Sequence, residues 1–216
     1  MNLNREIIEL LKQEGCDIIG FADLGSLPDE PRKGLGVGII MATTYAPQAV
    51  WDKLNDTQKQ VISDNWAVGS PLERCREAVK SFLKEKGYKR NTSYPTMQIT
   101  YKMLATLAGI GWVGRCALLV SKERGPAVRF TAVLTDAPFV CGTPITTSQC
   151  PPDCSCCAEA CPVKAISGEL WAQGIHRDEF FDVAACKKGR SKCHGLCIAH
   201  CPYAQKGLGY CIREPQ

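Results

Sequence analysis

A doubled cysteine pattern in the last third of the chain constrains the fold more than any other feature. The first copy reads Cys150-x3-Cys154-x2-Cys157-x3-Cys161, and Pro162 follows it. The second copy reads Cys186, then Cys193-x3-Cys197-x3-Cys201, and Pro202 follows it. The run C-x2-C-x2-C-x3-C-P is typical of bacterial proteins with two 4Fe-4S clusters, in which the fourth cysteine binds the other cluster. The pattern therefore predicts a small module built around two such clusters.

The crossed arrangement assigns eight cysteines to eight ligand positions. One cluster would be held by Cys150, Cys154, Cys157 and Cys201. The other would be held by Cys161, Cys186, Cys193 and Cys197. Cys156 is left over, and it can replace Cys154 or Cys157 if the loop bends differently.

A pair of structural zinc sites is the alternative, because four-cysteine zinc sites use similar spacings. The proline after the last cysteine of each run favours iron and sulfide over zinc. The histidines at positions 176, 194 and 200 find no vacant ligand position, and we expect them to be exposed or to lie beside the ligands. Cys16 and Cys75 are expected to be small core residues, whereas Cys116 and Cys141 are weaker candidates for chemistry.

Cysteine usage and the N-terminus together predict a cytoplasmic protein. Fourteen cysteines among 216 residues do not fit a disulfide framework, because residues 1–15 lack the apolar segment of a secretory signal. No run approaches the roughly 18 apolar residues of a spanning helix, so we expect no membrane association. The formal charge of +4 counts every cysteine as neutral. Ligating thiolates would bring the charge near zero, which weakens the case for a nucleic-acid partner.

The first two thirds of the chain mix helical and strand patterns. Apolar spacing predicts helices from residue 3 to Gly15, from Ser70 to Gly87 and from about residue 97 to 108. Short apolar runs predict strands at 17–22 and 36–44, and a turn-rich linker predicts a hairpin of 117–121 with 127–135. We therefore expect an α+β protein with an α/β domain at 1–141 and a cluster domain at 142–216.

One stretch resembles a known family. Residues 105–138, with AGIGWVGR at 108–115 and LTDAP at 134–138, are followed by the paired Cys-Pro runs. Together they resemble the epoxyqueuosine reductases and their relatives among the corrinoid reductive dehalogenases. The resemblance implies a nitroreductase-related α/β domain followed by a ferredoxin-like module with two 4Fe-4S clusters. It further implies that a corrinoid or a flavin lies over the N-terminal sheet, near Gly111, Trp112, Gly114 and Arg115.

The sequence departs from the family at the proton donor. The family carries an aspartate in an Asp-Thr-x-Pro element before the Ala-Gly-x-Gly-Trp stretch, whereas residues 90–98 here read RNTSYPTMQ and contain no acid. Tyrosine can act as a general acid, so Tyr94 or Tyr101 is the candidate that replaces the aspartate. The alternative is that both tyrosines pack in the core.

Three functions follow from the sequence. The first is an iron-sulfur oxidoreductase that passes electrons to a cofactor or a small-molecule substrate in the N-terminal domain. The second is a non-catalytic electron carrier or maturation partner, with an acidic redox protein steered by Lys187, Lys188, Arg190 and Lys192. The third is a corrinoid-dependent epoxyqueuosine (tRNA) reductase, although the missing aspartate and the end of the chain at Gln216, without the helical repeats of longer members, argue against tRNA. The resemblance also implies a ferredoxin or flavodoxin as electron donor, and a homodimer.

Overall fold

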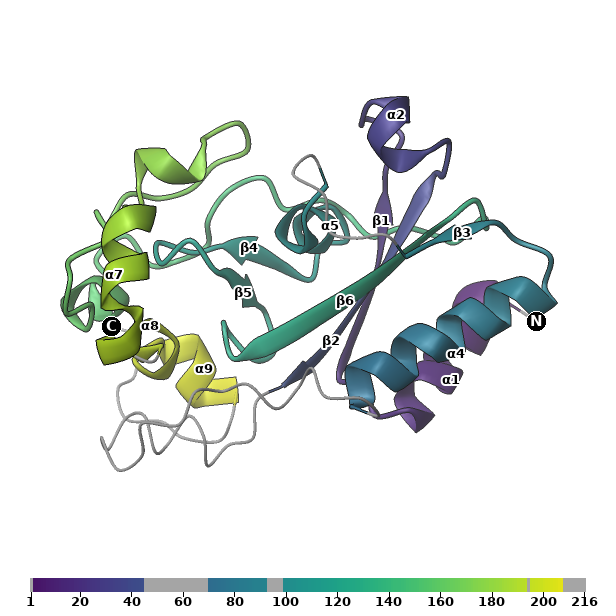
Figure 1. Ribbon diagram of the computed structural model, residues 1–216, viewed down its shortest axis with the longest axis horizontal. Helices are drawn as coiled ribbons and strands as arrows, with labels where there is room; N and C mark the ends of the chain where they lie inside the picture. The colour runs from purple at the N-terminus through teal and green to yellow at the C-terminus, as the bar shows by residue number, and fades with distance from the viewer. Residues whose placement is uncertain (1, 45–69, 93–98, 194, 208–216) are drawn as a thin grey trace. The chain divides into compact units, whose positions relative to one another are not determined.

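The computed structural model describes residues 2–44, 70–92, 99–193 and 195–207, without the side chains of 190–192 (Figure 1). The chain divides into two compact units that are discontinuous in sequence. The sheet unit comprises residues 1–43, 64–110 and 129–145, and the cysteine unit comprises 44–63, 111–128 and 146–216. The last boundary between the two units, after Ile145, lies within the region where the cysteine-rich composition begins. Residues 111–128, however, belong to the cysteine unit, so the continuous domains 1–141 and 142–216 stay a prediction.

A four-stranded sheet with the order β1-β2-β6-β3 forms the centre of the sheet unit. Its strands are β1 (Ile18–Asp23), β2 (Val37–Thr44), β3 (Arg90–Asn91) and β6 (Val128–Thr135). β1 and β2 are antiparallel, with Phe21 opposite Ile39, and β3 is antiparallel to β6. The strands expected at 17–22 and 36–44 are confirmed.

Two helices, α1 (Leu3–Gln13) and α4 (Pro71–Glu85), lie side by side on one face of this sheet (Figure 1). The Ser70 side chain accepts a hydrogen bond from the Glu73 amide and begins α4, as the sequence predicted. The apolar stripes of both helices join one core. It includes Ile7, Leu11, Phe21, Ile39, Met41, Cys75, Val79, Leu83 and Val133. A short helix, α2 (Asp29–Arg32), lies between β1 and β2 in the sequence.

The opposite face of the sheet packs against α5 (Tyr101–Leu107). Gly20 and Gly38 allow this close approach, since a β-carbon on Gly38 would lie 2.7 Å from Leu104 Cδ2. The predicted start of this helix near residue 97 is wrong. Thr100 accepts a hydrogen bond from the Met103 amide at 3.2 Å and caps the helix, so that Ile99 precedes it.

The cysteine unit contains a two-stranded antiparallel sheet and several short helices. β4 (Gly111–Val113) pairs with β5 (Leu119–Ser121), and Trp112 lies opposite Val120. The helices are α6 (Cys156–Glu159), a 3₁₀ helix at Arg177–Glu179, α7 (Val183–Cys193), α8 (Leu196–Ala199) and α9 (Pro202–Gly207).

The expected hairpin of 117–121 with 127–135 is wrong. The backbones of Ser121 and Gly125 exchange two hydrogen bonds, of 2.9 and 3.0 Å, and close a tight turn. After this turn the chain enters the four-stranded sheet as β6, whereas β5 pairs with β4. The apolar run of β4 has only three residues, which is too short to predict that β4 is the partner of β5.

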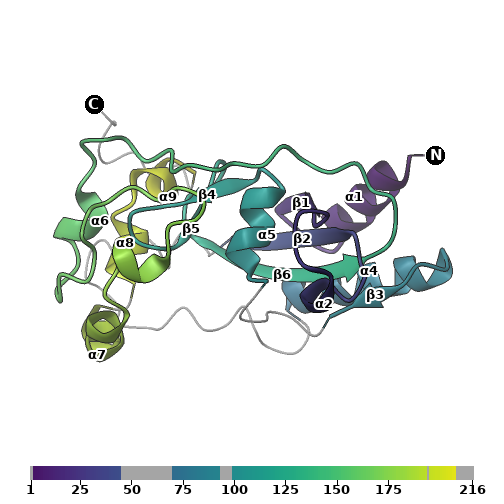
Figure 2. The same cartoon turned by 90° about the horizontal axis from the view of Figure 1, so that it is seen from above.

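After β6 the chain continues as an extended segment, which Figure 2 shows as a long trace without a helix or strand. Within the sheet unit it is held by backbone hydrogen bonds of 2.9 Å, from Gly142 to Phe21 and from Ile145 to Thr106. Across the described ranges, no helix is long and apolar enough to cross a membrane. Overall, the structure is a mixed α/β protein.

Candidate metal centre

The doubled cysteine pattern folds into two copies of one local structure. Cys157 lies in α6 and Cys197 lies in α8, and in each copy the cysteine four residues later follows the end of the helix and precedes a proline. The amide of Cys161 donates to Ala158 O at 3.3 Å, and the amide of Cys201 donates to Ile198 O at 3.2 Å. The sequence repeat is therefore also a structural repeat.

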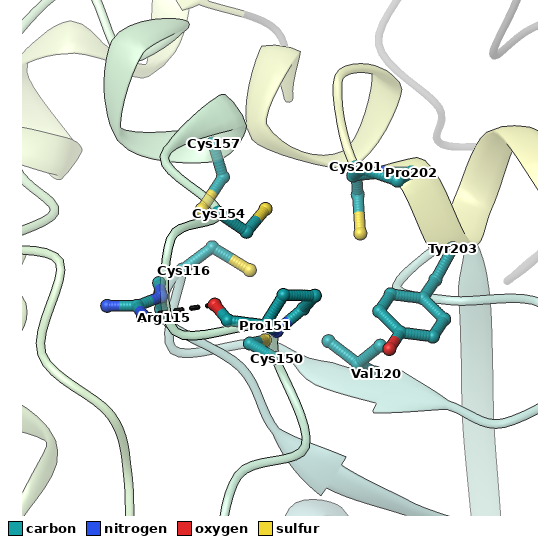
Figure 3. Close-up of a pocket in the computed structure, with 10 residues that line it drawn as sticks. All are labelled: Arg115, Cys116, Val120, Cys150, Pro151, Cys154, Cys157, Cys201, Pro202 and Tyr203. Carbon is teal, nitrogen blue, oxygen red and sulfur yellow. Dashed lines mark hydrogen bonds between the residues drawn. The ribbon is translucent and has the colours of Figure 1, made fainter. Parts of the chain in front are cut away.

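Four of the predicted ligands line one pocket, and they come from both copies. Figure 3 shows Cys150, Cys154 and Cys157 of the first copy together with Cys201 of the second. The remaining wall is formed by Arg115, Cys116, Val120, Pro151, Pro202 and Tyr203. These four cysteines are the set that the crossed arrangement assigns to one cluster.

The other four predicted ligands also lie near one another. Burial raises the pKa of Cys197 to about 12, and the negative charges of nearby cysteines add to this effect. These neighbours are Cys193, Cys157, Cys186 and Cys161. Cys161, Cys186 and Cys197 also share one apolar cluster. Cys161 of the first copy thus lies among the cysteines of the second copy.

Each thiol must lose its proton before it can bind a metal. Burial raises the pKa of Cys201 to about 12, although the backbone amides of Ala204 and Tyr203 oppose the shift by hydrogen bonding. Backbone amides donate to two other sulfurs, from Ala165 to Cys161 at 3.3 Å and from Gly195 to Cys193 at 3.4 Å. Once a bound metal cation offsets the cost of burying negative charge, these cysteine sites favour the deprotonated thiolate.

The donor set fits a polynuclear cluster. Among the described residues, no three His, Cys, Asp or Glu side chains are close enough to share one metal ion. In a 4Fe-4S cluster the thiolates are ligands of a multi-atom core, and the required arrangement is four sulfurs around a common space. The pocket lined by Cys150, Cys154, Cys157 and Cys201 has this arrangement.

Two of the residues predicted to bind a cofactor, Trp112 and Arg115, contact the loop that carries Cys150. The buried Trp112 donates from Nε1 to Cys150 Sγ at 3.4 Å. Arg115 donates from Nη2 to the carbonyl oxygens of Pro151 and Pro152, at 3.2 and 2.6 Å. These residues belong to the cysteine unit, in which β4 pairs with β5. A role of Gly111, Trp112, Gly114 and Arg115 in binding a corrinoid or a flavin stays a prediction.

Of the two candidate proton donors, only Tyr101 is among the described residues. It is the first residue of α5, half-buried, and its hydroxyl is hydrogen-bonded to Thr131. Burial raises its pKa, while that hydrogen bond and the charge of Arg76 act in the opposite direction. Tyr101 therefore keeps its proton at neutral pH. Tyr94 lies outside the described residues.

Other cysteines and His176 lie in different surroundings. Cys16 and Cys75 are buried in the apolar core of the sheet unit, as expected. Cys154 and Cys157 line the pocket, whereas Cys156 does not. His176 caps the 3₁₀ helix, and its Nδ1 accepts a hydrogen bond from the Asp178 amide.

Cys116, which the sequence marked only as a weaker candidate for chemistry, also lines the pocket. It follows AGIGWVGR directly and belongs to neither cysteine run, so no spacing signal identified it.

Comparisons with known proteins agree with the mixed α/β fold. No family model matches the chain. The epoxyqueuosine reductase of Aliivibrio fischeri is 28% identical over 149 residues, which cover 64% of this chain and 39% of that protein. The chain spans less than half the length of the curated relatives that it first matches.

Two solved structures show the same fold. A reductive dehalogenase, described with a mechanism for B12-dependent dehalogenation, has a TM-score of 0.65 at 17% identity and covers 96% of this chain and 33% of its own. An epoxyqueuosine reductase with a modified tRNA-Tyr stem loop has a TM-score of 0.55 at 22% identity. The match covers 78% of this chain and 54% of that chain. This chain is thus similar to epoxyqueuosine reductases and to reductive dehalogenases, and the resemblance in the sequence is confirmed.

Proposed function

We propose that this chain is an iron-sulfur oxidoreductase that holds two 4Fe-4S clusters. The observation that carries the proposal is the crossed position of Cys201, which lines the same pocket as Cys150, Cys154 and Cys157. Such crossing is the hallmark of two-cluster ferredoxin modules. When bound, the clusters would supply one-electron transfer to a cofactor or substrate of the N-terminal domain.

The residues of the chain would hold each cluster with four thiolates and tune it with hydrogen bonds. Cys150, Cys154, Cys157 and Cys201 would bind the first cluster. Cys161, Cys186, Cys193 and Cys197 would bind the second. Donors to ligand sulfurs are Trp112 Nε1 and the amides of Ala165 and Gly195. Arg115 fixes the backbone beside Cys150 through its two carbonyl contacts.

The acceptor would be a corrinoid or a flavin, since one structural neighbour is described as B12-dependent. Tyr101 would hold the transferable proton, although burial raises its pKa and makes the hydroxyl a weaker acid. A small molecule would be the substrate, and a ferredoxin or flavodoxin would supply the electrons.

Anaerobic purification followed by metal, sulfide and mass analysis tests this function. We expect a brown protein with about eight iron atoms and about eight sulfides per chain, broad visible absorption that bleaches with dithionite, and a bound corrinoid or flavin. Clusters without such a cofactor would contradict the acceptor but not the electron transfer. Zinc without iron would overturn the proposal.

An electron carrier is a second candidate, and exposed lysines favour it. Lys187 and Lys188 are exposed on α7, next to Cys186. Cations beside a cluster would attract an acidic partner and make the association rate depend on salt. An electron-transfer rate to an acidic ferredoxin that does not change between low and high salt would exclude this role.

A tRNA-modifying reductase is a third candidate, because one structural neighbour was solved with a tRNA stem loop. The absence of an acid from residues 90–98 argues against the aspartate mechanism. Loss of queuosine after gene deletion, restored by this chain, would establish that function. Unchanged queuosine would exclude it.

A further inference from the structure

Arg115 places a buried positive charge at the pocket of the first cluster. The residue follows β4, is 8% exposed, and lines the pocket together with Cys150, Cys154, Cys157 and Cys201 (Figure 3). An arginine side chain stays positively charged throughout the physiological pH range. The pocket wall therefore carries a fixed positive charge.

The guanidinium of Arg115 has carbonyl partners but no carboxylate partner. Its Nη2 donates to the carbonyl oxygens of Pro151 and Pro152, at 3.2 and 2.6 Å. Its Nε is buried and has no hydrogen-bond partner. Among the described residues, no aspartate or glutamate forms an ion pair with Arg115. Asp153, the acid that follows Pro152 in the sequence, is exposed.

A buried charge without a counter-charge is costly, because the protein interior does not replace the water that solvates the charge. The two carbonyl oxygens offset part of this cost. The four cysteines of the pocket would supply the rest when they bind a cluster, since four thiolates on an oxidised 4Fe-4S core leave a net charge of about −2. Negative charge of this kind is what the guanidinium lacks.

We propose that Arg115 is the buried counter-charge of the first cluster and makes this cluster easier to reduce. The inference rests on the proposed function. Reduction adds one electron, taken from the donor protein or from dithionite, and makes the cluster more negative by one charge. A nearby positive charge stabilises the reduced form more than the oxidised form. Arg115 is not a ligand in this account, and it acts through its charge.

An anaerobic redox titration monitored by electron paramagnetic resonance tests the proposal with two variants. Arg115→Gln keeps an amide donor for the carbonyl oxygens and removes the charge. We expect it to disfavour reduction of the first cluster by about tenfold, which lowers the midpoint by about 59 mV for one electron. Arg115→Lys keeps the charge without the planar guanidinium, and its midpoint should stay within about threefold of the wild type.

Lys122→Gln is the matched control, because it removes an exposed cation of the same unit by the same substitution. Solvent screens that charge, so the potential should not change. An equal fall in Arg115→Lys and Arg115→Gln would show that the hydrogen bonds to the loop, and not the charge, set the potential, and it would overturn the inference. An unchanged potential in Arg115→Gln with full iron would overturn it as well.

If Arg115→Gln does not fold or loses the first cluster, the iron content of the two variants becomes the measurement. Loss of about half the iron in Arg115→Gln, but not in Arg115→Lys, would support the counter-charge. The same loss in both variants would make Arg115 a structural residue and overturn the inference. A wild-type chain without clusters would defeat the proposed function itself, so the two failures are distinguishable.

Discussion

The indole nitrogen of Trp112 donates a hydrogen bond to Sγ of Cys150 at a distance of 3.4 Å. The same ring contacts Tyr203 edge to face, with centroids 5.1 Å apart and planes at 80°. Tyr203 follows Cys201 and Pro202, and its hydroxyl donates to Gln149 O at 3.2 Å. Trp112 therefore connects the segments that carry one cysteine from each copy of the pattern.

Replacement of Trp112 by phenylalanine keeps an aromatic ring and removes the donor. We expect the first cluster to become harder to reduce by about threefold to tenfold, because a charge-offsetting hydrogen bond to Cys150 is lost. A redox titration of the purified protein measures this. Trp171→Phe is the control, since Trp171 packs against Val113 and Phe180 rather than against a predicted ligand. Equal potentials in both variants would contradict the role of the hydrogen bond.

The crossed ligand assignment makes a prediction about pairs of variants. Cys150→Ala and Cys201→Ala should abolish the same cluster signal, because both residues line one pocket. Cys161→Ala and Cys197→Ala should abolish the other signal. Each variant should lose about half the iron. Spectra in which Cys161 and Cys150 affect the same signal would show that the ligands do not cross.

Gly125 is a site where any side chain should disturb the position of Cys201. A β-carbon there would lie 2.4 Å from the Ala204 amide nitrogen, and the residue has a φ of 58°. We expect Gly125→Ala to lower the free energy of unfolding by about 2 to 3 kcal/mol. Denaturant unfolding of the holo-protein measures it. Gly36→Ala is the control, because no atom lies within 4 Å of its β-carbon position, and equal losses in both would contradict the expectation.

The buried hydroxyl of Tyr101 predicts a pH dependence of stability. Its raised pKa means that the folded state holds the proton more tightly than the unfolded state. The corresponding stability is complete below about pH 10 and is lost as the pH rises through the folded pKa. We expect Tyr101→Phe to lose less stability than the wild type between about pH 8 and about pH 11. If the stability of the wild type and that of Tyr101→Phe change equally with pH, the Tyr101 hydroxyl has the same pKa in the folded and unfolded states.

The sequence predicted the elements whose signals are local. The periodic apolar residues and caps of α1 and α4 identified those helices, and the short apolar runs identified β1 and β2. The doubled cysteine spacing, with four cysteines and a following proline in each copy, predicted the grouping of Cys201 with Cys150, Cys154 and Cys157.

The errors have separate causes. β5 pairs with β4, the strand just before it in the chain, whereas β6 joins the four-stranded sheet, and the turn composition did not distinguish these partners. Thr100 shortened α5 because its side chain satisfies the Met103 amide. Cys116 was only a weaker candidate for chemistry, because its place at the pocket follows from where the β4–β5 turn lies and nothing in its immediate sequence marks it.

The most direct test of the central claim is the metal and sulfide content of the protein purified without oxygen. The account predicts about eight iron atoms and about eight acid-labile sulfides per chain, with visible absorption that dithionite bleaches. A colourless preparation with about two zinc ions per chain would contradict it.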